Sequence, residues 1–142
     1  MMELGLVVFN CTIFILLAGL HVYWLCDGRW GLGASVPTDS NGRKLFRPSR
    51  TATLVVAIGL LLFALCNMAV VGWLGSSLHP TYIRYGILII AIIFLLRAVG
   101  DFRYMGITKR HRQSRFARLD TWCYTPLCFA LAASHLILYT LG

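Results

Sequence analysis

The chain has 142 residues, of which 58% are hydrophobic, and a formal net charge of +8. Soluble domains usually contain about 45–50% apolar residues, so this composition, with a mean hydropathy of +0.75, excludes an ordinary soluble domain and indicates one integral membrane domain over residues 1–142. Because the basic residues border apolar runs and no soluble domain presents them, the charge favours anionic membrane lipids as partners and argues against nucleic acid.

The first apolar run covers residues 4–26 and carries no charged side chain. At about 1.5 Å per residue it is long enough to cross a hydrocarbon core about 30 Å thick, so it is predicted to be the first span. No cleavable signal peptide is expected, because Glu3 is present and no basic residue precedes this run. The following loop is rich in Gly, Pro and Ser, places Trp30 near the headgroups, and has room for a re-entrant or lid-like segment.

The second span is predicted over residues 51–75, with glycines and serines marking its end. Pro80 and Tyr82 then form a tight turn before the next apolar run. Because a short connection joins helices that run in opposite directions, spans two and three are predicted to be antiparallel neighbours.

The third apolar run is too short to cross a bilayer by itself. Only residues 85–96, between Arg84 and Arg97, are uncharged, which corresponds to roughly 18 Å of helix. We therefore expect the third span to cover residues 82–104, with Arg97 inside it.

The fourth span is predicted over residues 121–141, and the distribution of charge orients all four spans. Apart from Arg84, every Lys and Arg lies in residues 27–50 or 97–120. Cytoplasmic loops of membrane proteins are enriched in Lys and Arg, so both segments are predicted to be cytoplasmic loops and both termini to lie on the outer side. The predicted fold is all-α, an integral membrane four-helix bundle.

A charged pair is predicted inside the third span. Arg97 and Asp101 are four residues apart, so on a continuous helix they share a face and neutralise each other, which lowers the cost of placing either charge in the bilayer. Two interpretations stay open. The pair serves insertion alone, or it lines a water-filled cavity that binds a ligand, since ionisable residues within spans are commonly functional.

His21 is predicted at the depth of Arg97, and Asp120 at the start of the fourth span. A histidine can act as acid, base or proton relay if a carboxylate faces it, or it can be a neutral ring bonded to a backbone carbonyl. Asp120 either caps the fourth helix or faces a pocket. In the functional interpretation, one cytoplasm-facing cavity collects the polar side chains at this depth. Its candidate residues are His21, Trp24, Arg97, Asp101, Arg103, Asp120 and Tyr124.

Polar residues also occur in the outer halves of three spans. Asn10, Asn67 and His135 are interpreted as hydrogen-bonding across helices, with an outer half-channel as the alternative. The 5 cysteines are scattered through the apolar runs without a metal-ligand spacing. They are interpreted as small apolar side chains, and no metal or cofactor is predicted.

The segment KRHRQSRFARLD, residues 109–120, mixes basic and apolar side chains in a way typical of a short helix lying in the headgroup plane. Anionic lipids are predicted to bind its basic residues, at about 1 kcal/mol for each. In the alternative interpretation, the segment binds no specific ligand and only determines the orientation of the protein in the membrane. The basic residues are Lys109, Arg110, Arg112, Arg115 and Arg118.

Three stretches carry a resemblance to a known family: HVYW (residues 21–24), LLRAVGDFRYMG (95–106) and RFARLDTWCYTPLC (115–128). Most of the chain resembles an uncharacterised bacterial family of small four-span membrane proteins that carries a domain-of-unknown-function label. The resemblance implies a multi-pass protein of the bacterial inner membrane and supplies no activity. The residues characteristic of the family are here His21, Trp24, Arg97, Gly100, Asp101, Arg103, Asp120 and Pro126.

Three functions fit these patterns. The first hypothesis is binding or transport of a small amphiphile or lipid headgroup in the cytoplasm-facing cavity. The second is a membrane-embedded enzyme acting on a lipid or isoprenoid substrate, with His21 or an Asp as general base and Arg97 or Arg103 holding an anionic group. The third is a structural subunit of a membrane complex. Assembly as a homo-oligomer or with a membrane partner protein is compatible with each.

Overall fold

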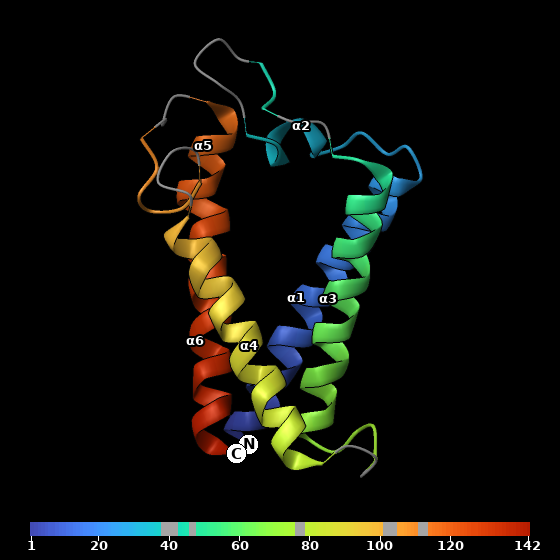
Figure 1. The fold of residues 1–142 in the computed structure, drawn as a ribbon, viewed down its shortest axis with the longest axis vertical. Coiled ribbons are helices and arrows are strands. Elements are labelled where there is room, and N and C mark those ends of the chain that lie inside the picture. Colours follow the sequence, from blue (N-terminus) through green and yellow to red (C-terminus); the bar gives the residue numbers. More distant parts are fainter. Residues whose placement is uncertain (38–42, 46–47, 76–78, 101–104, 111–113) are drawn as a thin grey trace.

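The structure is a computed structural model that describes residues 1–37, 43–45, 48–75, 79–100, 105–110 and 114–142. Within these ranges the regular elements are helices, so the predicted all-α class is confirmed (Figure 1). In chain order they are α1 (Met2–Leu25), α2 (Leu32–Ser35), α3 (Arg50–Val70), α4 (Pro80–Val99), α5 (Arg115–Leu119), the π-helical turn η1 (Asp120–Tyr124) and α6 (Thr125–Leu141). Four helices are long and apolar enough to span a membrane, namely α1, α3, α4 and the helix formed by α5, η1 and α6.

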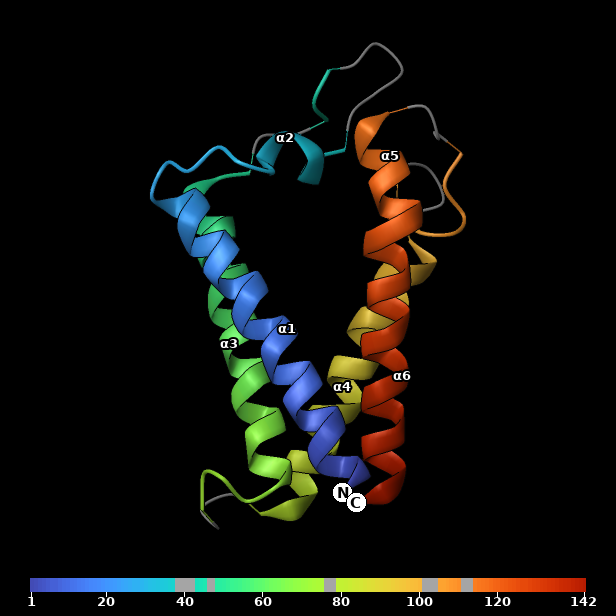
Figure 2. The ribbon, with the colours of Figure 1, turned by 180° about the vertical axis from the view of Figure 1, so that it is seen from behind.

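The four spans are arranged as two antiparallel hairpins (Figures 1 and 2). In the first hairpin α1 packs along α3, and in the second α4 packs along α6. The hairpins approach each other at the end that holds both chain termini, here called the terminal end, and diverge toward the end with α2 and α5, here called the basic end. The predicted pairing of spans two and three is therefore only partly right, because α3 and α4 are connected at the terminal end but each packs mainly within its own hairpin.

Two helices end earlier than predicted, because each is followed by a glycine in the left-handed region. α3 ends at Val70 instead of residue 75, and Gly72 has φ 74°. α4 ends at Val99 instead of residue 104, and Gly100 has φ 88°. Only glycine adopts such angles without strain, so it commonly marks the end of a helix.

The fourth spanning helix begins earlier than predicted, at Arg115 instead of residue 121. Ser114 caps it, since its hydroxyl oxygen accepts a hydrogen bond of 3.0 Å from the amide of Ala117. Two interpretations are corrected by this. Asp120 is not the helix cap, and α5 is the first part of the fourth span (Figure 2) rather than a separate helix in the headgroup plane.

The hairpins are joined by an aromatic cluster at the point where they converge. Phe14 of α1 is fully buried, and its ring centroid lies 5.7 Å from that of Phe63 on α3 and 5.6 Å from that of Phe94 on α4. Leu131 of α6 belongs to the same core. We call Phe14, Phe63 and Phe94 the aromatic floor, because these rings join the two hairpins, which diverge toward the basic end (Figures 1 and 2).

A polar network lies beside the aromatic floor and also links both hairpins. Asn10 of α1 donates to Asn67 of α3 at 3.0 Å, and Asn67 donates to Nε2 of His135 on α6 at 3.0 Å. Ser134 donates to Asn10 at 2.7 Å, while Nδ1 of His135 donates to the carbonyl of Leu131. The four polar side chains are buried. The prediction that Asn10, Asn67 and His135 bond across helices is confirmed.

The outer surface of the spans suits a bilayer. Only 28–39% of the residues in the most apolar stretches of the four spans are buried within the protein, so most of these side chains face outward. Trp30 and Trp122 are exposed at the basic end, and Trp73 is exposed at the terminal end. Tryptophans at both ends of an apolar surface are typical of the two membrane interfaces.

Candidate functional site

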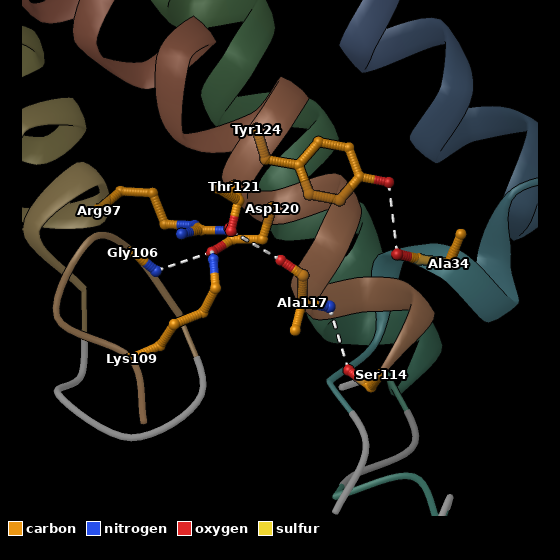
Figure 3. Close-up of polar contacts among 9 residues, drawn as sticks. All are labelled: Ala34, Arg97, Gly106, Lys109, Ser114, Ala117, Asp120, Thr121 and Tyr124. Atoms are coloured by element: carbon orange, nitrogen blue, oxygen red, sulfur yellow. Dashed lines mark hydrogen bonds and ion pairs between the residues drawn. The ribbon is translucent and has the colours of Figure 1, made fainter. Parts of the chain in front are cut away.

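The strongest polar cluster at the basic end is centred on Asp120 (Figure 3). Its carboxylate is completely buried and accepts three hydrogen bonds. Arg97 of α4 donates to Oδ1 at 2.9 Å, and Lys109 and the backbone amide of Gly106 each donate to Oδ2 at 2.8 Å. Two cations therefore share one carboxylate, and the cluster carries a net charge of +1.

The π-helical turn η1 places Asp120 within the fourth span. Pro126 lacks an N–H and cannot bond to the carbonyl four residues earlier, so a regular α-helix is disfavoured here. The chain widens by one residue instead, and the amide of Thr125 bonds to the carbonyl of Asp120. Figure 3 shows the Asp120 side chain directed from this turn toward Arg97 on α4.

Two glycines bring the other donors to Asp120. A Cβ on Gly100 would collide with the carbonyl of Met105, and a Cβ on Gly106 would collide with the carbonyl of Val99. Both have positive φ, 88° and 79° respectively. This close approach lets the chain fold back after α4, with Ile107 N bonded to the Ala98 carbonyl at 3.1 Å. The backbone amide of Gly106 and the amine of Lys109 are thereby directed at the carboxylate.

The predicted continuation of the third helix beyond Arg97 is corrected, because α4 ends at Val99, before Asp101. The structure shows Arg97 paired with Asp120, 23 residues away along the chain. Asp101 and Arg103 lie outside the described residues.

The prediction that Lys109 binds lipid headgroups is also wrong. Its amine is buried and bonded to Asp120, so it is not available to a membrane surface. Arg110, Arg115 and Arg118 are exposed at the basic end, where binding of anionic lipid stays a prediction. Arg112 lies outside the described residues.

Arg97 has unused hydrogen-bonding capacity. Its Nη2 binds Asp120, but its Nη1 is buried and has no hydrogen-bond partner among the described residues. The side chain as a whole is 30% exposed, so it lies at the edge of the cluster rather than inside it. Thr125 Oγ1, one residue after η1, is the other buried side-chain polar atom without a partner in the described ranges. Unpaired buried donors are rare in native proteins and call for a ligand or a water.

His21 and Trp24 lie on the other hairpin and do not contact Asp120. His21 Nδ1 donates to the carbonyl of Leu17 at 2.7 Å, which is the structural alternative considered for it. The indole of Trp24 donates to the carbonyl of Trp30 at 2.9 Å, and its ring lies 4.9 Å from that of His21. The structure thus brings Arg97 and Asp120 together, whereas His21 and Trp24 belong to α1 of the other hairpin.

Tyr124 connects the two hairpins at the basic end. Its hydroxyl donates to the carbonyl of Ala34 in α2 at 3.3 Å (Figure 3). Its ring also lies 6.0 Å from that of Phe116 in α5. Because α2 belongs to the loop of the first hairpin, this bond ties that loop to the second hairpin across the basic end. Sequence reasoning named Tyr124 but not Ala34, whose contribution is a backbone carbonyl.

The chemistry of this cluster favours binding over proton transfer. The three donors occupy both carboxylate oxygens of Asp120, which leaves it poorly placed to act as a general base. Within the part of the chain that the structure describes, no three His, Cys, Asp or Glu side chains are grouped as a metal would require. What the cluster offers a ligand is positive charge and a free guanidinium N–H.

Comparison with known proteins gives a family but no activity. A family model described as "Protein of unknown function (DUF3995)" matches residues 14–135. No curated protein and no solved structure matches the chain. The match includes the Asp120 cluster, the aromatic floor, all of α3 and α4, and part of α1 and α6.

Proposed function

Since the chain belongs to the DUF3995 family, whose function is unknown, we propose from its geometry that it binds an anionic amphiphile between the two hairpins at the basic end. The observation that carries this proposal is the Arg97 guanidinium. One of its amino groups is fixed by Asp120, and the other, Nη1, is buried without a partner among the described residues. A phosphate or carboxylate oxygen supplies the missing acceptor, and the net charge of +1 on the cluster favours an anion.

The apolar part of the ligand is accommodated below Arg97. Phe94 of the aromatic floor precedes Arg97 by three residues on α4, so it lies on the same helix face, about one turn away from Arg97. Leu17, Phe63, Phe94 and Leu127 are only partly buried, although they pack against the core. A charged group one turn from partly exposed apolar side chains matches an amphiphile, with its head at Arg97 and its tail toward the aromatic floor.

The binding proposal is tested with Arg97→Gln. This variant keeps the bond between Lys109 and Asp120, so the buried carboxylate stays neutralised and the fold is retained. Loss of a charge-assisted hydrogen bond, worth about 1.5–3 kcal/mol, is expected to weaken binding of short-chain phosphatidylglycerol by about ten- to a hundredfold. Binding is measured by native mass spectrometry of the detergent-solubilised protein, with short-chain diacylglycerol as the uncharged comparison ligand.

Arg29→Gln is the matched control, because Arg29 is an exposed arginine at the same end and is not among the predicted lipid-binding residues. It should bind phosphatidylglycerol as the wild type does. Equal binding by the wild type and Arg97→Gln, with both stable, would refute the proposal and favour a purely structural role in a membrane assembly. A fall in both arginine variants would mean that the lipid binds to general surface charge.

We further propose that the basic end faces the cytoplasm of a bacterial inner membrane and that both termini lie outside. The support is the concentration of exposed Arg and Lys at one end of the spans. In a background without the native cysteines, Lys44→Cys and Leu74→Cys are expected to react with a membrane-impermeant thiol reagent from opposite faces, because they lie at opposite ends of α3. From intact spheroplasts only Leu74→Cys should label. Labelling of Lys44→Cys there would reverse the orientation.

A further inference from the structure

A separate cavity lies at the terminal end, far from the Asp120 cluster. It has a volume of about 950 Å³ and is lined by residues from the ends of α1, α3, α4 and α6. Val70, Ile87 and Leu138 give it apolar walls, while Glu3, His79 and Arg84 contribute polar groups. By the proposed orientation it opens at the outer interface of the membrane.

One wall of this cavity presents hydrogen-bond donors. The guanidinium of Arg84 lies 4.7 Å from the ring centroid of Tyr139, which holds it by a cation–π contact. It forms no ion pair with a carboxylate among the described residues. His79 Nδ1 accepts a hydrogen bond from the amide of Thr81, so in the neutral ring Nε2 carries the proton and is a donor. Two donors on one wall suit the oxygens of an anionic group.

The opposing charge comes from another helix. Glu3 of α1 lines the same cavity, and it too forms no ion pair within the described part of the chain. A cation and a carboxylate that share a cavity without pairing are complementary to a ligand carrying both charges. We infer that this cavity binds a phosphate–amine zwitterion of the phosphoethanolamine type, with the phosphate at Arg84 and His79 and the ammonium at Glu3. This site is independent of the function proposed for the basic end.

The test compares short-chain phosphatidylethanolamine with phosphatidylglycerol, which has the phosphate but lacks the amine. Titrations use the full chain with Arg97→Gln, so that loss of binding at the basic end does not enter the comparison. In this background phosphatidylethanolamine should bind at least tenfold more tightly. Adding Glu3→Gln should remove that preference, whereas adding Arg84→Gln should weaken both lipids at least tenfold.

Two further variants keep the inference falsifiable if Arg84→Gln unfolds. Arg84→Lys retains the charge and should retain binding, and Arg29→Gln, which removes an exposed arginine at the basic end that has no assigned role in lipid binding, should change neither lipid. Competition by free glycerophosphoethanolamine at similar concentration would support a soluble zwitterion, and binding confined to the acylated form would support a membrane lipid. A preference for phosphatidylethanolamine that persists in Glu3→Gln would overturn the inference, as would unchanged binding in stable Arg84→Gln.

Discussion

Asp120→Asn is expected to lower the free energy of unfolding by about 3–5 kcal/mol, the cost of removing one partner from a buried ion pair. Asn keeps the size of the side chain but not its charge. Arg97 and Lys109 would then lie together without a counter-charge, and Lys109 is almost completely buried. The effect is measured as the melting temperature in mild detergent, where the variant should unfold well below the wild type.

Asp27→Asn is the matched control for this substitution. Asp27 also pairs with an arginine, Arg50, at 2.8 Å, but both side chains are at least 75% exposed. Exposed ion pairs contribute little to stability because water already solvates both charges. The control should therefore melt close to the wild type, and equal melting temperatures for the two Asn variants would contradict the importance assigned to the buried cluster.

A second substitution tests why Asp120→Asn is expected to lose stability. Adding Lys109→Met to Asp120→Asn removes the more buried of the two unpaired cations, and Arg97 can extend toward solvent. The double variant is therefore expected to be more stable than Asp120→Asn alone. A further loss of stability in the double variant would mean that Lys109 stabilises the fold by its packing instead.

The sequence predicted the architecture well, because hydropathy and charge act over whole spans. Three long apolar runs, a shorter one between Arg84 and Arg97, and two basic segments were enough to give the four spanning helices and to place the basic segments at one end. The pairing of helices was less predictable. The hairpins are held by contacts between distant segments, such as Phe14 with Phe94, which no local pattern contains.

The partner of Arg97 was missed for a local reason and a distant one. Gly100 follows an apolar run that ends in a basic residue, which is a common pattern at a helix terminus and could have predicted that the helix ends before Asp101. The true partner, Asp120, depends on a chain reversal and a π-helical turn. Neither follows from residue spacing. The bond between Lys109 and Asp120 was not predicted, because the sequence neighbours of Lys109 are also basic and the whole segment was interpreted as a surface.

Polar residues within the apolar runs predicted contacts between helices more reliably than the spacing of charged residues did. Asn10, Asn67 and His135 were each recognised as polar residues in an apolar run, and the structure joins them in one network. Ser134 was not recognised, because serine is tolerated in many helix positions and often bonds to its own backbone. Here it also donates to Asn10.

Asn67→Leu is expected to lower the free energy of unfolding by about 2 kcal/mol. Leucine has the same branching at Cγ as asparagine, but the substitution removes the acceptor of Asn10 and the donor to His135, leaving two buried polar groups unpaired. Each such group costs about 1–3 kcal/mol in soluble proteins, and hydrogen bonds between helices in a bilayer contribute somewhat less. The loss expected for two unpaired groups is therefore about 2 kcal/mol. Since the network joins α1 and α3 to α6, the variant should also loosen the contact between the hairpins.

Thr12→Val provides the control, because Thr12 is an exposed residue on α1 whose hydroxyl bonds only to the carbonyl of Val8 in its own helix. Its melting temperature should equal that of the wild type. The double variant Asn10→Leu with Asn67→Leu should lose less stability than the two single losses added together, because Asn10 is no longer present to be left unpaired. Strict additivity would indicate that the two asparagines act separately, and the hairpins would then depend on apolar packing for their junction.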